Sequence, residues 1–533
     1  MTKTYLKPLV LAVSVALALT ACGKQEPAQA PVAPAGTAST AGTASTAGPA
    51  SVASAASTAA PAPSVFDVSE LGALTEACQD FNQFVNAKWI AANPIPADQT
   101  VWGSFNLLRE KSLKDQHMLV DAADKNADSA TAGSIEQKIG WLYRSSMNMD
   151  VRNKAGFEPL KPYLAKIDAL KSNKDLPAWL NQSFAQGDSA VFRFGARADY
   201  KNAKMQIASA NQGGLGLPTP AYYSDAQYKD VRAAYVKYLA QLFELTGVPA
   251  EEAAHKADLA MKLETELATH SIPRVEMRKP ENQYHFVSVA EANKVTPHFD
   301  WNNFFKSQGV TVDKGFSLSQ PKFFAEMDKL LTSAPLDEWK AYLAAQTISG
   351  AADALSEPFV DARFGFYDKT LRGQPEQKPQ WKRSLDSVND GMGQALGQLY
   401  VAKYFPPEAK QRAEELVQNI RDALKNRIEN LDWMSAETKT KAIDKWNKFL
   451  PKIGYPQKWR SWEGLKISPD NYFANMEAAQ KFDYDYNIAK IGQATDRQEW
   501  FMTPQTVNAY YNPTDNTINF PAAILQPPFF YAK

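Results

Sequence analysis

The five histidines are the side chains of this sequence that could bind a metal ion through an imidazole nitrogen. A hydrolytic zinc site on a helix needs two histidines at positions i and i+4, with a glutamate directly after the first. His117, His255, His270, His285 and His298 are each followed by a residue other than glutamate, and no two of them lie four positions apart. The sequence therefore predicts no such site, and each histidine is interpreted as an ordinary surface or core side chain.

Other catalytic patterns are also missing from the sequence. It contains no Gly-x-Ser-x-Gly motif, no Gly-x-x-x-x-Gly-Lys phosphate loop and no cluster of cysteine ligands. Cys78 could act as a nucleophile, but no base lies near it in the sequence, so we expect a small buried thiol. Because no catalytic motif is present, we look for the functional site in the predicted secondary-structure elements.

Length and charge limit the classes of function. A chain of 533 residues is long enough for roughly two to four domains. Its 58 basic and 58 acidic residues give no formal net charge. Because no overall positive field attracts a phosphate backbone, the sequence predicts no binding to nucleic acid.

The N-terminus has the pattern of an export signal. Lys3 and Lys7 precede an apolar run that is shorter than the roughly 20 residues of a membrane-spanning helix. The run ends in Leu19-Thr20-Ala21-Cys22, which resembles the bacterial lipobox, so Cys22 is the predicted lipidation site. An ordinary signal peptide with an incidental cysteine is the alternative. The residues that follow are mostly Ala, Thr, Ser, Gly and Pro, a composition that predicts a disordered tether.

Helical periodicity dominates from about Val65 onward. Apolar residues recur every three or four positions over Ala413 to Leu431 and over Glu251 to Thr269, so we predict two helices that each bury one face. Ser435 is a predicted N-cap for a further helix that ends before Pro451. Near the C-terminus, the β-prone runs Thr506 to Tyr511 and Thr517 to Phe520 flank a loop of turn-forming residues, which predicts a hairpin.

Many motifs of the chain, in sequence order, closely resemble those of neprilysin-type (M13) zinc metallopeptidases. They are Cys78-Gln-Asp-Phe-Asn-Gln-Phe-Val-Asn86, Trp89, Asn93-Pro-Ile-Pro96, Trp102-Gly-Ser-Phe105, Gly214-Leu-Gly-Leu-Pro218, Tyr222-Tyr223, Trp381-Lys-Arg383, Gly397-Gln-Leu-Tyr400, Asp432-Trp-Met-Ser435, Glu437-Thr438, Lys452-Ile-Gly-Tyr-Pro456, Val507-Asn-Ala-Tyr-Tyr511 and Phe520-Pro-Ala-Ala-Ile-Leu-Gln-Pro-Pro-Phe-Phe530. The resemblance covers about residues 74–533.

The resemblance implies a mainly α-helical, two-lobed architecture with a large helical cap lobe and an incomplete catalytic lobe that carries a short β-hairpin. The expected division is a lipoprotein signal peptide (1–21), the disordered tether (22–64), an N-terminal signature segment of the catalytic lobe (65–106), the cap lobe (107–449) and the truncated start of the catalytic lobe (450–533).

The resemblance also implies where a peptide would bind. In the family, the Asn-Ala-(Phe/Tyr)-Tyr element is an edge strand that holds an extended peptide, so Asn508 would contribute its amide and Ala509 its carbonyl group. The alternation along this strand predicts that Val507, Ala509 and Tyr511 share a packed face. A strand paired on both sides inside a sheet is the alternative.

Zinc is the cofactor that the resemblance implies, yet the sequence lacks the His-Glu-x-x-His motif and the third ligand. No catalytic residue and no metal ligand are therefore assigned. We expect a family of zinc metalloendopeptidases that hydrolyse oligopeptides, and a chain that is inactive alone. A non-catalytic peptide-binding envelope lipoprotein is the alternative, with an envelope structural role as a further one.

The expected partners and location follow from the same features. They are oligopeptide substrates or ligands, the membrane through the N-terminal lipid, and a separate chain that could supply the missing catalytic part. The apolar tail residues Ile524, Leu525, Phe529 and Phe530 would need such a cover. The expected location is the cell envelope, lipid-anchored at the outer membrane and facing the periplasm.

Overall fold

The computed structural model describes residues 69, 71–72 and 76–532, which belong to one compact unit. The predicted signal peptide, the lipidation site Cys22 and the predicted tether 22–64 lie outside the described residues. Within the described part of the chain, helices predominate, as expected for a mainly α fold. No helix there combines the length and the apolar content that crossing a bilayer requires.

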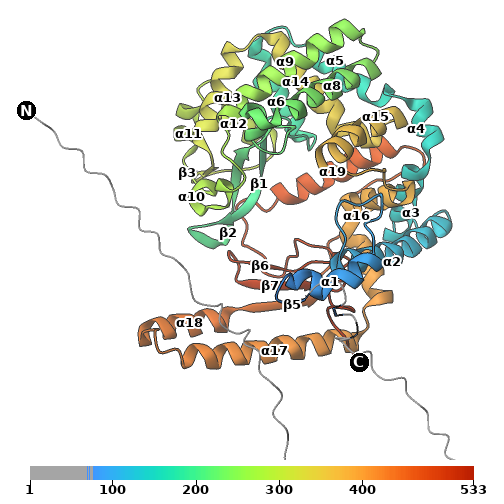
Figure 1. Cartoon of the computed structure of the whole chain (residues 1–533). Helices are drawn as coiled ribbons and strands as arrows, with labels where there is room; N and C mark the ends of the chain where they lie inside the picture. The colour runs from blue at the N-terminus through green and yellow to red at the C-terminus, as the bar shows by residue number, and fades with distance from the viewer. Residues whose placement is uncertain (1–68, 70, 73–75, 533) are drawn as a thin grey trace, which may run out of the picture. The chain divides into compact units, whose positions relative to one another are not determined.

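The first four α-helices and the last four lie toward the two ends of the described part of the chain (Figure 1). They are α1 (Phe81–Ala92), α2 (Ser104–Asn126), α3 (Ile135–Met147), α4 (Met149–Ala155), α16 (Gln380–Tyr404), α17 (Pro407–Glu429), α18 (Ala436–Lys448) and α19 (Tyr472–Ile488). The α-helices between them are α5 (Lys161–Asp168), α6 (Leu176–Ala185), α7 (Ala221–Ser224), α8 (Lys229–Leu245), α9 (Ala250–Thr269), α10 (Pro280–Gln283), α11 (Val289–Val295), α12 (Trp301–Ser307), α13 (Pro321–Ser333), α14 (Leu336–Ala351) and α15 (Glu357–Arg363).

Two sheets accompany the helices. The first has the strand order β1-β2-β4-β3, formed by Phe192–Asp199, Asn202–Gln212, Phe316–Leu318 and Phe286–Val287 respectively. The second has the order β5-β7-β6, formed by Leu450–Gly454, Thr517–Pro521 and Tyr510–Asn512. Strands β5 and β7 run parallel, whereas β6 and β7 form the antiparallel hairpin predicted from the sequence.

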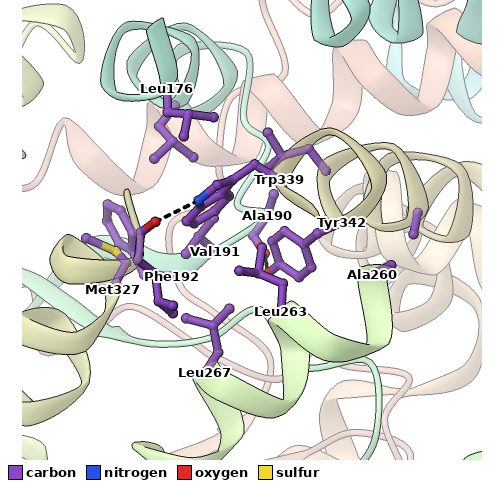
Figure 2. Close-up of a cluster of buried hydrophobic side chains, with 14 of the residues drawn as sticks. Leu176, Ala190, Val191, Phe192, Ala260, Leu263, Leu267, Met327, Trp339 and Tyr342 are labelled. Atoms are coloured by element: carbon purple, nitrogen blue, oxygen red, sulfur yellow. Dashed lines mark hydrogen bonds between the residues drawn. The ribbon is translucent and has the colours of Figure 1, made fainter. Parts of the chain in front are cut away.

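Two hydrophobic cores hold these elements together. The larger core packs the first sheet against helices of the α5–α15 region and includes the fully buried Trp339 (Figure 2). The second core packs α2, α3 and α16 against the segments around Val507 and Ala522. Helix α19 contributes to both, because Phe473 packs on the larger core and Tyr472 belongs to the second. The second core thus packs the segments that flank the C-terminal hairpin against α2, α3 and α16.

The predicted helices form, and two of them behave as expected. Helix α9 buries Leu263 and Leu267. Ser435 caps α18, because its Oγ accepts a hydrogen bond from the Thr438 N–H at 3.2 Å, and the helix ends at Lys448. Apolar spacing and a local side-chain cap determine both features within one short segment.

The prediction that the helix at Ala413 to Leu431 buries its apolar face is wrong. Helix α17 pairs with α18 (Figure 1), yet Leu416, Ile420 and Leu424 are 47%, 59% and 49% exposed. These three residues are spaced four apart and therefore form one row along the helix. Amphipathic spacing identifies such a row, but it does not supply the element that covers it.

Candidate peptide-binding site

Strand β6 is the edge of the second sheet. Its register pairs Tyr510 with Asn519 and Asn512 with Thr517 of β7, and no other described strand pairs with it. Because β6 has a neighbour on one side only, one row of its backbone N–H and C=O groups is available to a further strand. The alternative of a strand paired on both sides does not hold among the described residues.

Asn508 and Ala509 lie directly before β6 rather than inside it, so the first predicted strand is shorter than expected. The Asn508 side chain is exposed, and its Oδ1 accepts a hydrogen bond from the Ala509 N–H at 2.8 Å. The Nδ2 group of Asn508 donates to no described residue. The local geometry thus fixes the side-chain oxygen and leaves the amide nitrogen as a donor beside the strand edge.

The predicted alternation is only partly correct. Val507 is buried in the second core, but Tyr511 is exposed. Tyr510 is half-buried, and its hydroxyl accepts a hydrogen bond from the Phe501 N–H at 2.9 Å. Burial raises the pKa of Tyr510 to about 12, so this hydroxyl stays neutral and able to donate near pH 7. The strand starts after Ala509, which is why the expected two-residue period does not extend over the whole segment.

Helices α16 and α2 hold the segment that leads into β6. The buried side chain of Gln505 donates to Asn389 Oδ1 at 2.8 Å and to the Gly393 carbonyl at 2.9 Å. The Gln505 carbonyl accepts a hydrogen bond from Ser112 at 2.9 Å. At Gly397, a Cβ atom would lie 2.6 Å from Pro504, so the close approach of α16 requires glycine. Sequence reasoning missed these positioning residues because the partners are more than 100 positions apart.

The loop of the hairpin is held by its own side chains. Asp515 Oδ1 accepts hydrogen bonds from the Thr517 N–H at 3.1 Å and from the Thr517 hydroxyl at 2.7 Å. Asn516 has a φ of 54°, a conformation that asparagine adopts more readily than most residues. The turn residues recognised in the sequence therefore fix the register of β6 on β7.

The remaining candidate residues are not gathered at one place. Cys78 is exposed, so the expected buried thiol is wrong: it lies in a turn that precedes α1, outside both cores. His117 stacks on Trp381 with ring centroids 4.3 Å apart, and His298 Nδ1 lies 2.8 Å from Asp328 Oδ2. Each of these histidines has a local partner in the fold.

Over the described part of the chain, no three His, Cys, Asp or Glu side chains converge as a metal site would require. A tetrahedral zinc site needs three or four such ligands around one point. The described residues therefore do not fit a zinc ion.

The apolar tail lies next to the second core. Ile524 and Leu525 are half-buried against it, whereas Phe529 is exposed and stacks obliquely on Phe105 with ring centroids 4.5 Å apart. The tail therefore buries part of the surface that was expected to be uncovered.

Comparisons with known proteins agree with this fold. The family model for the N-terminal part of Peptidase family M13 matches residues 77–456 of this chain. A second model of the same family matches residues 508–533. The crystal structure of Mycobacterium tuberculosis zinc metalloprotease ZMP1 in complex with inhibitor is 35% identical and superposes with a TM-score of 0.83. The match covers 88% of this chain and 71% of that one. PepO from Lactobacillus rhamnosis, at 24% identity and a TM-score of 0.79, shares the fold.

Curated relatives are similar over most of this chain. Neprilysin-3 of Drosophila melanogaster is 29% identical over 495 residues, and human endothelin-converting enzyme 1 is 28% identical over 488 residues. Both matches cover 87% of this chain, but the chain spans only 62% of the length of each relative. Since a family model matches well over half of the residues, this chain belongs to peptidase family M13, the neprilysin-like zinc metallopeptidases.

Proposed function

We propose that the chain provides the peptide-holding part of a neprilysin-like zinc metalloendopeptidase that acts on oligopeptides. The observation that carries this proposal is the edge of β6, which has no further described strand partner and lies beside the exposed Asn508. An extended peptide can add to such an edge through main-chain hydrogen bonds. An oligopeptide has its backbone groups available for this pairing, whereas a folded protein has most of them already bonded.

Asn508 and Ala509 have separate roles in this proposal. The Nδ2 group of Asn508 would donate to a carbonyl of the peptide, because Oδ1 is already bonded to the Ala509 N–H. The Ala509 carbonyl would accept from a peptide N–H. Val507 and Gln505, which precede these two residues in the chain, are buried and fix the position of the segment. The segment therefore loses less conformational entropy when a peptide binds.

We further propose that these 533 residues hold a peptide without cleaving it. The described residues do not fit zinc, and the sequence contains no His-Glu-x-x-His motif. Hydrolysis would then need zinc ligands from a further polypeptide segment of the M13 type. The exposed row Leu416, Ile420 and Leu424 on α17 is apolar surface that such a segment could cover.

The exposed row on α17 should make the isolated chain self-associate as its concentration rises, because apolar surface without a cover is buried between copies. Sedimentation velocity measures this association, and a chain that stays monomeric at all concentrations would contradict the prediction.

One preparation tests the main proposal. The purified chain should contain no stoichiometric zinc, should not cleave a fluorogenic oligopeptide, and should bind an N-acetylated, C-amidated oligopeptide by calorimetry. Cleavage that a chelator abolishes, in a preparation free of other proteases, would show that the chain is active alone. Absence of any peptide binding would remove the function assigned to β6.

Replacement of Asn508 by alanine should weaken binding of the blocked oligopeptide about fivefold, because one neutral hydrogen bond is lost. Asn419→Ala is the matched control, since Asn419 is exposed on α17 and hydrogen-bonds to no described residue. The control should bind like the unaltered chain. Equal affinities of all three proteins would show that the Asn508 amide does not contact the peptide.

A non-catalytic peptide-binding lipoprotein is the second candidate, favoured by the lack of a metal-binding group in the described residues. Coexpression with a polypeptide that carries the His-Glu-x-x-His segment separates the two. Recovered hydrolysis supports the peptidase, whereas peptide binding that never leads to cleavage supports the binding protein.

The cell envelope is the proposed location in both cases, with a lipid on Cys22 that anchors the chain at the outer membrane facing the periplasm. The proposal rests on the lipobox-like sequence that ends at Cys22. Fractionation of cells that express Cys22→Ser should find the protein released from the membrane. A variant that stays in the membrane fraction would contradict the lipid anchor.

A further inference from the structure

A cavity of about 540 Å³ lies away from the strand β6. Its volume is within the range of about 300 to 1,000 Å³ that is typical of small-molecule sites. One part of the wall is aromatic and includes Trp179, Phe364 and Phe473, while α16 lines another part with charged side chains. None of the residues 505–512 lines it. The cavity is therefore distinct from the site proposed for extended peptides.

Arg383 and Asp390 are the two charged residues of α16 that define the proposed site. Both line the cavity, and they lie seven positions apart on one helix. Seven residues span nearly two turns, so the two side chains start from the same face about 10 Å apart along the axis. The departure from helical geometry in α16 is at Met392, beyond both residues.

Asp390 and Arg383 lack the partners that neighbouring charges have. Asp390 makes no hydrogen bond or ion pair with any described residue. Arg383 donates to Gln380 and forms no ion pair with a described carboxylate, and its Nε is without a hydrogen-bond acceptor there. By contrast, the lining residues Lys378 and Asp386 form an ion pair of 2.7 Å. The helix thus offers one carboxylate and one guanidinium that a ligand could pair.

Arg383 is half-buried, whereas the Asp390 side chain is exposed to solvent where it lines the cavity. The surrounding protein and the nearby carboxylates of Asp386 and Asp353 raise the pKa of Asp390. Burial lowers the pKa of the Arg383 guanidinium. A ligand carboxylate would offset the desolvation of the Arg383 guanidinium, and a ligand ammonium group could reach the accessible Asp390 carboxylate.

The spacing of Arg383 and Asp390 along α16 matches the length of a short peptide. An extended chain advances by about 3.4 Å per residue, so the terminal ammonium and carboxylate groups of a tripeptide lie about 10 Å apart. We propose that this cavity binds zwitterionic peptides of about three residues, with the peptide carboxylate on Arg383 and the ammonium group on Asp390. The aromatic wall would take an apolar side chain of the peptide. This site does not depend on the function proposed for β6.

Four forms of one tripeptide test this assignment on the purified full chain. Gly-Phe-Gly with both termini free is compared by calorimetry with its N-acetyl form, its C-amide form and the form blocked at both ends. The pair on the half-buried Arg383 should contribute about tenfold in affinity and the pair on the exposed Asp390 about threefold, so the free peptide should bind about tenfold more tightly than its C-amide form and about threefold more tightly than its N-acetyl form. Equal affinity of the free and doubly blocked peptides, or no binding of the free peptide, would overturn the proposal.

Two variants assign the ends of the peptide. Asp390→Asn should abolish the effect of N-acetylation and keep the effect of C-amidation, whereas Arg383→Gln should do the reverse. Asp444→Asn is the control, because Asp444 is a surface residue of α18 paired with Lys448. In the Asn508→Ala protein, where any contribution of the β6 edge is weakened, the free peptide should keep its preference over the blocked forms, which separates this site from β6. An Asp390→Asn protein that still discriminates against the N-acetyl form would contradict the proposed contact.

Discussion

Replacement of Trp339 by alanine is expected to lower the free energy of unfolding by about 4 kcal/mol, since removal of a large buried aromatic side chain costs roughly 3 to 5 kcal/mol. Trp339 lies on α14 and is fully buried among Val191, Phe192 and Tyr342 (Figure 2). Its indole nitrogen donates to the Leu330 carbonyl at 2.9 Å. That carbonyl also accepts a hydrogen bond from the Ala334 N–H, so the main loss is packing.

Trp433→Ala is the matched control for this experiment, because Trp433 is 77% exposed. Surface substitutions usually change stability by less than about 0.5 kcal/mol. Urea unfolding followed by far-ultraviolet circular dichroism should therefore show a large shift for the first variant and almost none for the second. Similar midpoints for the two proteins would show that the larger core does not determine the stability of the chain.

Glu264 is expected to make stability depend on pH. This residue of α9 is fully buried, and its two carboxylate oxygens accept hydrogen bonds from Tyr223, Tyr235, Gln346 and the Gly216 N–H at 2.7 to 3.2 Å. Burial raises its pKa from 4.5 to about 7, although these hydrogen bonds lower it. The folded chain thus binds more protons than the unfolded chain between these two pH values, so its stability falls as the pH rises.

The size of this effect follows from the shift of the pKa. The contribution is complete below pH 4.5 and is lost as the pH rises through about 7, a difference of about 3 kcal/mol. Urea unfolding at pH 5 and at pH 8 should show most of this difference, about 2.5 kcal/mol. The glutamine of Glu264→Gln cannot titrate, so the part of the pH dependence that Glu264 causes should disappear from this variant. The readout is the difference in the free energy of unfolding between the two pH values, and a lower stability of the variant at both pH values does not affect it.

Glu437→Gln is the control for the pH experiment. Glu437 is a mostly exposed residue of α18, in an ion pair with Lys441. This variant should keep the pH dependence of the unaltered chain, because a solvated surface carboxylate changes little on unfolding. A Glu264→Gln protein with the same pH dependence as the control would show that Glu264 does not take up the proton.

Local patterns predicted the elements whose causes lie within a few residues. The helices α9 and α18, the Ser435 cap and the hairpin of β6 and β7 formed as expected, since spacing, capping and turn residues act over short distances. The first sheet was not predicted. Its β2 and β4 strands pair Ser209 with Ser317, and no local pattern specifies a parallel partner about 100 residues away.

The candidate sites differ in the same way. Asn508 and Ala509 could be proposed from a motif, but their exact place before β6 depends on Gln505, which α16 and α2 hold. The Arg383 and Asp390 pair could be seen as a helix spacing only after α16 was known to line a cavity with α6 and α19. The exposure of Leu416, Ile420 and Leu424 on α17 could not be predicted either, because an amphipathic pattern does not show whether another element packs on the apolar face.

By itself, the sequence determined the helical character of the chain, its membership of peptidase family M13 and the absence of a His-Glu-x-x-His motif. These properties depend on residue types and their spacing along the chain. Only the tertiary structure decided which apolar faces are covered, which edge of β6 lacks a strand partner and which charges line one cavity. Those properties depend on contacts between residues far apart in sequence, which the chain can make only after both cores have packed.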